Sequence, residues 1–205
     1  MLFQKGNWKK RGVFMRILDS RFSRMIETIG NLLQLSLVWL IMCLPIITIF
    51  PATVAMYGIV RKWISGRDIN GIFRVYFSLF RECFMQSFLI SIGWFMFVYF
   101  LYLDYHIMQF SGSFLILGLV TFLFLAITVY LFPSMAHFDA NWKDIIRNSI
   151  TMAIAYPVKT VLLVGIFLAT IFLIYIFPIS IFILGSGSAY LSYSIYHRLY
   201  EKLTK

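Results

Sequence analysis

The titratable and nucleophilic side chains of this sequence are too scattered to form a catalytic site. An enzyme needs clustered acids, a nucleophile beside its base, or ligands at metal-binding spacing. No acid lies near the middle of a hydrophobic stretch, and no two of the three histidines have a metal-binding spacing. The eight acids are Asp19, Glu27, Asp68, Glu82, Asp104, Asp139, Asp144 and Glu201. We therefore predict a protein that is not an enzyme and holds no metal or cofactor.

A pair of prolines in a hydrophobic run gives the first candidate site. Pro45 and Pro51 bracket a possible broken helix, and Thr48 and Thr53 lie beside them. Backbone groups freed by such a break, together with threonine hydroxyls, could bind a polar solute inside a membrane. The alternative is a proline kink whose freed backbone groups are satisfied by neighbouring helices.

Aromatic and basic residues gather in two polar segments, 61–83 and 133–159, and give the second candidate site. Arginine and aromatic side chains are the usual anchors of a protein–protein interface. The same residues also anchor helices at a membrane surface without any partner, and both interpretations stay open. The candidate interface consists of Trp63, Phe77, Phe80, Arg81, Phe84, Trp142 and Lys143.

The elements that carry these residues must lie in lipid. Of the 205 residues, 61% are hydrophobic and 13% are charged, and the mean hydropathy is +0.86. A soluble domain carries about a quarter charged residues. The stretches 25–60, 82–142 and 160–197 contain no Lys or Arg, although the net charge is +10. Basic residues confined to the ends and to two internal clusters follow the positive-inside rule and disfavour nucleic-acid binding.

If every basic cluster is cytoplasmic, each stretch between clusters must cross the membrane an even number of times. The sequence therefore predicts an all-α polytopic transmembrane helical bundle of about six segments, with both termini in the cytoplasm. The membrane domain is 28–197, with segments at about 28–44, 46–63, 84–103, 114–132, 160–177 and 179–196. Five segments are the alternative, because 46–60 is only about 15 residues and would cover roughly 22 Å.

The two ends of the chain are predicted to be basic and cytoplasmic. Residues 1–27 form a basic N-terminus with an amphipathic helix at the inner membrane surface, because apolar residues recur at three- and four-residue steps over 14–33. The alternative is that 14–33 is the solvated start of the first membrane segment. Residues 198–205 form a short basic tail. Near it, Gly185-Ser186-Gly187-Ser188 has no basic partner for a phosphate, so we expect these small residues to allow close helix packing.

The segment Leu44–Thr53 (LPIITIFPAT) resembles the YesL-like family of bacterial integral membrane proteins, and the match continues through Tyr57 and Arg61-Lys62-Trp63 to Gly66-Arg67-Asp68. Phe50 departs from the family, which tends to carry Gly there. The resemblance implies a protein of unknown biochemical function, mainly from Gram-positive bacteria, that is often encoded beside carbohydrate ABC importers.

Two functions follow as hypotheses. The first is a non-enzymatic accessory protein of the bacterial plasma membrane, whose aromatic–basic segments contact permease subunits of a carbohydrate ABC importer. The second is a small-solute transporter or channel that uses the break at Pro45–Pro51.

Overall fold

The computed structural model describes residues 26–67, 69, 71–108, 114–137 and 142–203, and these residues form helices joined by short turns. The N-terminal helix covers Ile26–Met42 within this part of the chain. The elements that follow are η1 (Ile46–Thr48), α2 (Ile49–Ile64), α3 (Ile72–Met108), α4 (Phe114–His137), α5 (Trp142–Ala155), α6 (Pro157–Ile176), η2 (Pro178–Ser180) and α7 (Ile181–Leu203). The prediction of an all-α protein is confirmed. Most of the predicted amphipathic helix over 14–33 lies outside the described residues.

Among the described residues, three helices are long and apolar enough to cross a membrane, which agrees with a membrane-embedded protein. They are Ile72–His106, Leu115–Ala136 and Pro157–Ile176, and Ile26–Met42 is a shorter apolar helix. The position of the predicted second segment in the fold explains why it is short.

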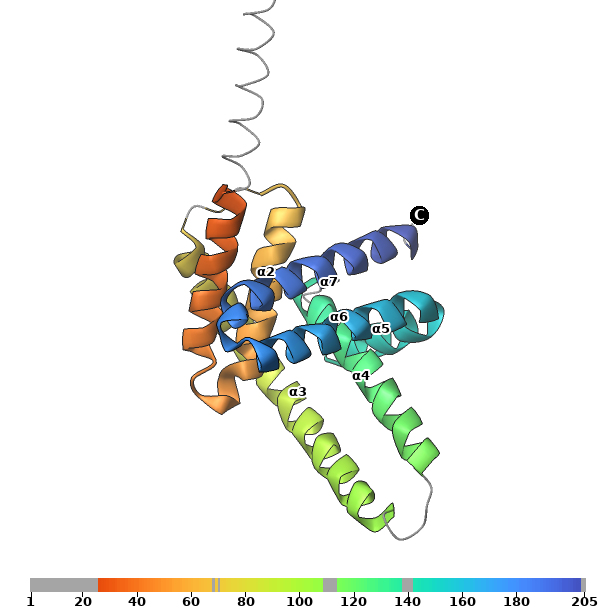
Figure 1. Ribbon diagram of the computed structural model, residues 1–205. Helices are drawn as coiled ribbons and strands as arrows, with labels where there is room; N and C mark the ends of the chain where they lie inside the picture. Colours follow the sequence, from red (N-terminus) through yellow and green to blue (C-terminus); the bar gives the residue numbers. More distant parts are fainter. Residues whose placement is uncertain (1–25, 68, 70, 109–113, 138–141, 204–205) are drawn as a thin grey trace, which may run out of the picture.

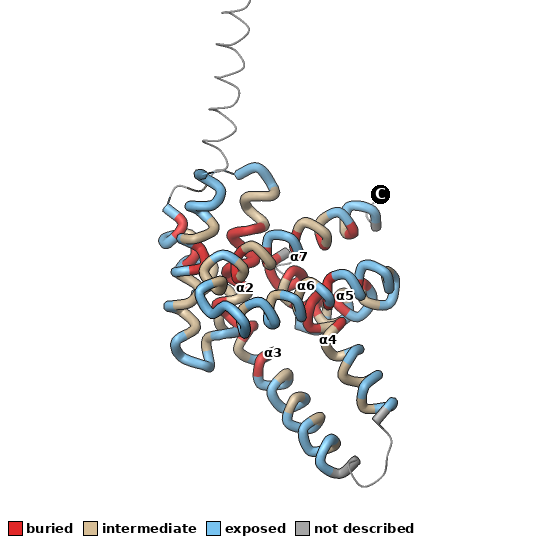
Figure 2. The backbone as a smooth tube through the Cα atoms, viewed as in Figure 1, coloured by how far each residue is buried: buried red, intermediate tan, exposed pale blue. Residues whose placement is uncertain are grey.

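That second segment, α2, lies at the centre of the molecule and is largely covered by the other helices. It packs against α3, α4 and α7, and Phe50 to Val60 are buried except for Thr53. Figure 2 shows the buried residues gathered around this helix. The unpaired backbone N–H and C=O groups at the ends of a helix that is surrounded by protein can hydrogen-bond to neighbouring helices. The length of such a helix therefore need not match the thickness of the hydrocarbon.

The predicted break at Pro45–Pro51 lies at Pro45 and not at Pro51. Pro51 is the third residue of α2, and the helix runs through it to Ile64. Proline is tolerated in the first helical turn because the N–H groups there have no partner within the helix. The interruption lies before Pro51, over the turn at Cys43 to Pro45 and the short helix η1.

The third helix begins far earlier than the predicted segment 84–103. α3 has 37 residues, which gives a length of about 55 Å, well beyond the roughly 30 Å of hydrocarbon. The second half of the supposed polar segment 61–83 is therefore helical. α4 likewise extends past residue 132 to His137, and the far halves of α3 and α4 project from the bundle as a hairpin (Figure 1).

The C-terminal half folds as a bent helix followed by a tight hairpin. α5 ends at Ala155 and α6 begins at Pro157. Proline has no backbone N–H to continue the hydrogen bonding of α5, so the two helices are separate. The Thr160 hydroxyl lies 3.0 Å from the carbonyl oxygens of both Ala153 and Tyr156, so it closes the bend. The predicted turn at Pro178 is confirmed. The predicted tail 198–205 is instead helical as far as Leu203, because α7 continues through it.

Small residues bring α7 against the N-terminal helix, as predicted for Gly185–Ser188. Ser36 donates its hydroxyl to that of Ser186 at 2.8 Å, and Ser186 donates to the Leu32 carbonyl at 2.9 Å. A Cβ atom on Gly185 would lie 3.5 Å from the Trp39 ring. This packing fixes α6 and α7 across the pair formed by the N-terminal helix and α2 (Figure 1).

Candidate functional site

Three of the candidate interface residues form a row along α3. Successive ring centroids are 6.5 Å apart from Phe77 to Phe80, 5.5 Å from Phe80 to Phe84, and 6.1 Å from Phe84 to Phe88. Because helical residues three and four apart share a face, these rings make a continuous strip, which we call the phenylalanine ladder. It lies in the N-terminal half of α3.

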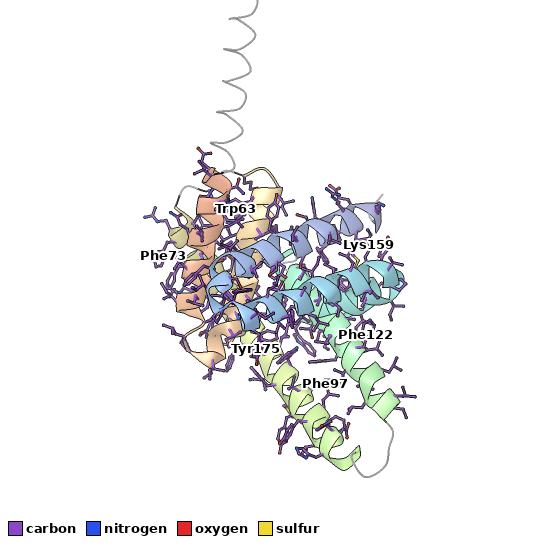
Figure 3. All side chains as sticks on the ribbon, in the orientation of Figure 1. Trp63, Phe73, Phe97, Phe122, Lys159 and Tyr175 are labelled. Carbon is purple, nitrogen blue, oxygen red and sulfur yellow. The ribbon has the colours of Figure 1, made fainter. Side chains whose placement is uncertain are left out.

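The ladder is partly covered by its own chain and partly open. Phe80 packs against the main hydrophobic core, whereas Phe77 is 47% exposed. Phe73, one turn before Phe77, is 60% exposed and lies at the margin of the molecule in Figure 3. Arg81 is exposed beside the strip. The open end therefore offers aromatic rings and a cation together.

The remaining candidate interface residues lie on other helices. Trp63 is near the end of α2 and packs partly against the core. Trp142 begins α5, is 52% exposed, and has the Lys143 ammonium 5.4 Å from its ring centroid. That distance suits a cation–π interaction. The structure thus places Trp142 and Lys143 at the start of a separate helix, apart in the chain from the ladder.

At the predicted helix break, the polar groups are already hydrogen-bonded within the chain. The Thr48 hydroxyl lies 2.5 Å from the Met42 carbonyl oxygen and 2.6 Å from that of Pro45. Pro45 itself is exposed, and Pro51 is fully buried in α2. Thr48 therefore closes the turn, and of the four residues proposed for this site only Thr53 lines an internal cavity.

The cavity next to Thr53 was not anticipated from the sequence. It has a volume of about 410 Å³ and is lined by residues of the N-terminal helix, α2, α3, α4, α6 and α7. Aromatic rings dominate its wall, among them Trp39, Phe50, Trp94, Phe132 and Phe167. We refer to it as the aromatic cavity.

Two matched tryptophan–threonine pairs hold the wall of the aromatic cavity. The Trp39 indole N–H donates to Thr53 Oγ1 at 3.2 Å, and that of Trp94 donates to Thr128 Oγ1 at 3.1 Å. Each threonine hydroxyl donates in turn to a carbonyl four residues earlier in its own helix, at 2.7 Å for Thr53 and 2.8 Å for Thr128. These pairs fix the indole orientations. Their sequence signal was weak, since each polar atom stands alone in an apolar helix.

A second, smaller cavity lies where α2 ends. It has a volume of about 230 Å³ and is lined by Arg61, Lys62, Ser65 and Arg67. The Arg61 guanidinium also donates to the carbonyl of Ala136 near the end of α4. Basic side chains suit the last turn of a helix, where unpaired carbonyls carry partial negative charge. Arg61 therefore joins the ends of two helices in addition to adding charge.

Within the part of the chain that the structure describes, no group of three or more His, Cys, Asp or Glu residues could hold a metal ion. Among the described residues, an exposed aromatic strip, an apolar cavity and a small basic pocket are the three features that this region offers for contact with a ligand or partner.

Comparison with known proteins gives relatives without an assigned activity. Residues 32–105 match a family described as a protein of unknown function, DUF624. The uncharacterized protein YteU of Bacillus subtilis (strain 168) is 27% identical over 162 residues, which cover 73% of this chain and 71% of YteU. The uncharacterized protein YesL of the same organism is 24% identical over 139 residues, covering 65% of this chain and 66% of YesL. No solved structure matches significantly.

Proposed function

Because these relatives confirm the resemblance to the YesL-like family, we propose that this chain is a non-enzymatic accessory protein of the plasma membrane. In this proposal it binds a partner membrane protein through the open end of the phenylalanine ladder. Both termini lie in the cytoplasm, and so does the open end of the ladder at Phe77, which precedes the predicted membrane segment 84–103. A permease subunit of a carbohydrate ABC importer is the proposed partner, a choice that follows from the family resemblance alone.

The observation that carries the proposal is the exposure of large aromatic rings in the N-terminal half of α3, a helix longer than the hydrocarbon is thick. Phe73 and Phe77 are 60% and 47% exposed, and α3 is about 25 Å longer than the hydrocarbon. Single exposed apolar residues are ordinary, but a stacked strip flanked by arginine has the composition of an interface centre. Arg74 and Arg81 provide that flank.

The test is recovery of a partner from native membranes with a tagged chain. Phe77→Ala removes an exposed ring that packs against only one end of the ladder, so the protein should still fold. Truncating a central aromatic anchor costs about 2 kcal/mol or more, which corresponds to a loss of roughly 30-fold in affinity. We expect Arg81→Ala to lose much less, since exposed charges contribute on the order of 0–1 kcal/mol.

Phe100→Ala is the matched control, because Phe100 is 58% exposed on the same helix but lies in its far half. Recovery of an importer permease with Phe100→Ala and its loss with Phe77→Ala supports the proposal. Equal recovery with both variants contradicts it. The same assay on Trp142→Ala and Lys143→Ala shows whether the start of α5 belongs to the interface.

The aromatic cavity favours a second candidate function, that of a carrier for an uncharged small molecule. Thr53, one of the residues proposed for a solute site, is part of its wall. Uptake by the purified protein in vesicles tests this alternative, and the accessory proposal predicts no uptake.

A further inference from the structure

The aromatic cavity opens toward the surface that lipid would cover. Three of its lining residues are substantially exposed at the outside: Ile49 by 37%, Phe95 by 44% and Ile171 by 51%. Phe95 and Ile171 belong to α3 and α6, two of the helices that can span a membrane. A molecule entering between them would come from the hydrocarbon and not from water.

Hydrogen-bond donors in the cavity wall are already used within the protein. Both indole N–H groups donate to threonines. The Thr170 hydroxyl donates to the Ile166 carbonyl at 2.8 Å, and that of Ser188 to the Gly185 carbonyl at 3.0 Å. The side chain of Ser192 lies beside the Tyr57 hydroxyl. A ligand would therefore meet aromatic faces and few free polar groups.

This wall chemistry selects against a sugar or an ion. No lining residue is charged, and a sugar would have to leave most of its hydroxyls without partners. Each unpaired buried polar group costs about 1–3 kcal/mol. Apolar cavities of about 150 Å³ stay dry and bind apolar molecules such as benzene, so a cavity of 410 Å³ can hold a longer apolar group.

We propose that the aromatic cavity binds a hydrocarbon chain of a membrane lipid, which enters between α3 and α6. The chain lies against the rings of Trp39, Trp94 and Phe132. The site is separate from the phenylalanine ladder and goes beyond the accessory function. Its role is to couple the packing of the central α2 to the lipid around the protein.

Quenching of tryptophan fluorescence by phosphatidylcholine brominated in its acyl chains tests this proposal. The protein contains five tryptophans, so Trp8, Trp63 and Trp142 are replaced by phenylalanine to leave Trp39 and Trp94 as reporters. The filling variant is Thr170→Leu, which extends a cavity-lining side chain and removes a bond only within α6. The matched control is Ala169→Leu, at an exposed position on the same helix.

We expect quenching in the parent protein to fall at least twofold with Thr170→Leu and to stay unchanged with Ala169→Leu. Native mass spectrometry should show a retained lipid on the parent and on Ala169→Leu, and its loss on Thr170→Leu. If Thr170→Leu does not fold, Ser188→Leu fills the cavity from α7 instead. Equal quenching in parent, filled and control proteins overturns the proposal. So does displacement of the quenching by millimolar glucose, which would indicate a polar site. Neither result depends on partner recovery through Phe77.

Discussion

Replacing Ser186 by alanine should loosen the contact between α7 and the N-terminal helix. The Ser186 hydroxyl takes part in two interhelical hydrogen bonds, one from Ser36 and one to the Leu32 carbonyl. Hydrogen bonds between membrane helices average about 0.6 kcal/mol and reach about 1.7 kcal/mol. Loss of both bonds should therefore lower the free energy of unfolding by about 1–2 kcal/mol.

The lower end of that range is expected, because the structure offers a substitute bond. Ser36 lies four residues after Leu32, and its hydroxyl can turn to the carbonyl that Ser186 releases. A larger side chain at position 186 would clash with its neighbours, and the substitute hydrogen bond could not offset this. Ser186 is fully buried beside Gly185, which is already near the Trp39 ring. Ser186→Leu should cost a further 1–3 kcal/mol, approximately, through overpacking.

The assay is equilibrium unfolding in mixed micelles of mild detergent and sodium dodecyl sulfate, applied as a double-mutant cycle. Ser36→Ala and Ser186→Ala together should show a coupling energy of about 0.5–1.5 kcal/mol. Ser194→Ala is the control, because the Ser194 hydroxyl donates to the Tyr190 carbonyl within α7 and should contribute little to the helix contact. Additive single effects, or a loss with Ser186→Ala no larger than that with Ser194→Ala, would refute the reasoning.

Three further predictions follow from the remaining contacts. Arg61→Met should lower the free energy of unfolding by about 1.5–3 kcal/mol, since the charged donor to the Ala136 carbonyl at the end of α4 is lost. Lys62→Met should lower it by less in the same unfolding experiment. Ser87→Ala should be neutral or stabilising, because the Ser87 hydroxyl is buried without a hydrogen-bond partner among the described residues. Ser149→Ala should be destabilising, because it removes a hydrogen bond of 2.9 Å to the Ile145 carbonyl. The reverse order of stabilities in unfolding experiments would contradict this prediction. A reporter fused after Lys62 should be cytoplasmic and one inserted between 106 and 113 external, and labelling of residue 65 from outside the cell would favour the five-segment topology.

Sequence patterns were sufficient wherever one physical requirement acted along a single element. Long runs without Lys or Arg indicated a membrane protein, because charge is excluded from hydrocarbon. Pro178 marked the last hairpin, since it cannot continue a helix. Gly185 to Ser188 indicated close packing, and the structure places Ser186 against Ser36. Each of these results depends on local composition.

The sequence could not show which helix is enclosed by the others. The segment 46–60 seemed too short to span the membrane, and the tertiary structure explains its length by burying α2 at the centre. Element boundaries failed for a related reason. The mixture of aromatic, basic and polar residues at the start of α3 is typical both of a polar loop and of an amphipathic helix. The local pattern therefore could not show that this stretch is helical.

The aromatic cavity depends wholly on the tertiary structure. Its wall combines Trp39, Thr53, Trp94 and Thr128, which come from four different helices. Thr53 was singled out beside Pro51, but the tryptophan that binds it lies 14 residues earlier. Periodicity can place a residue on a helix face, but the partner of that face depends on how the helices pack. The sequence thus determined that this protein resides in the membrane, and the packing of its helices decided where its cavity lies.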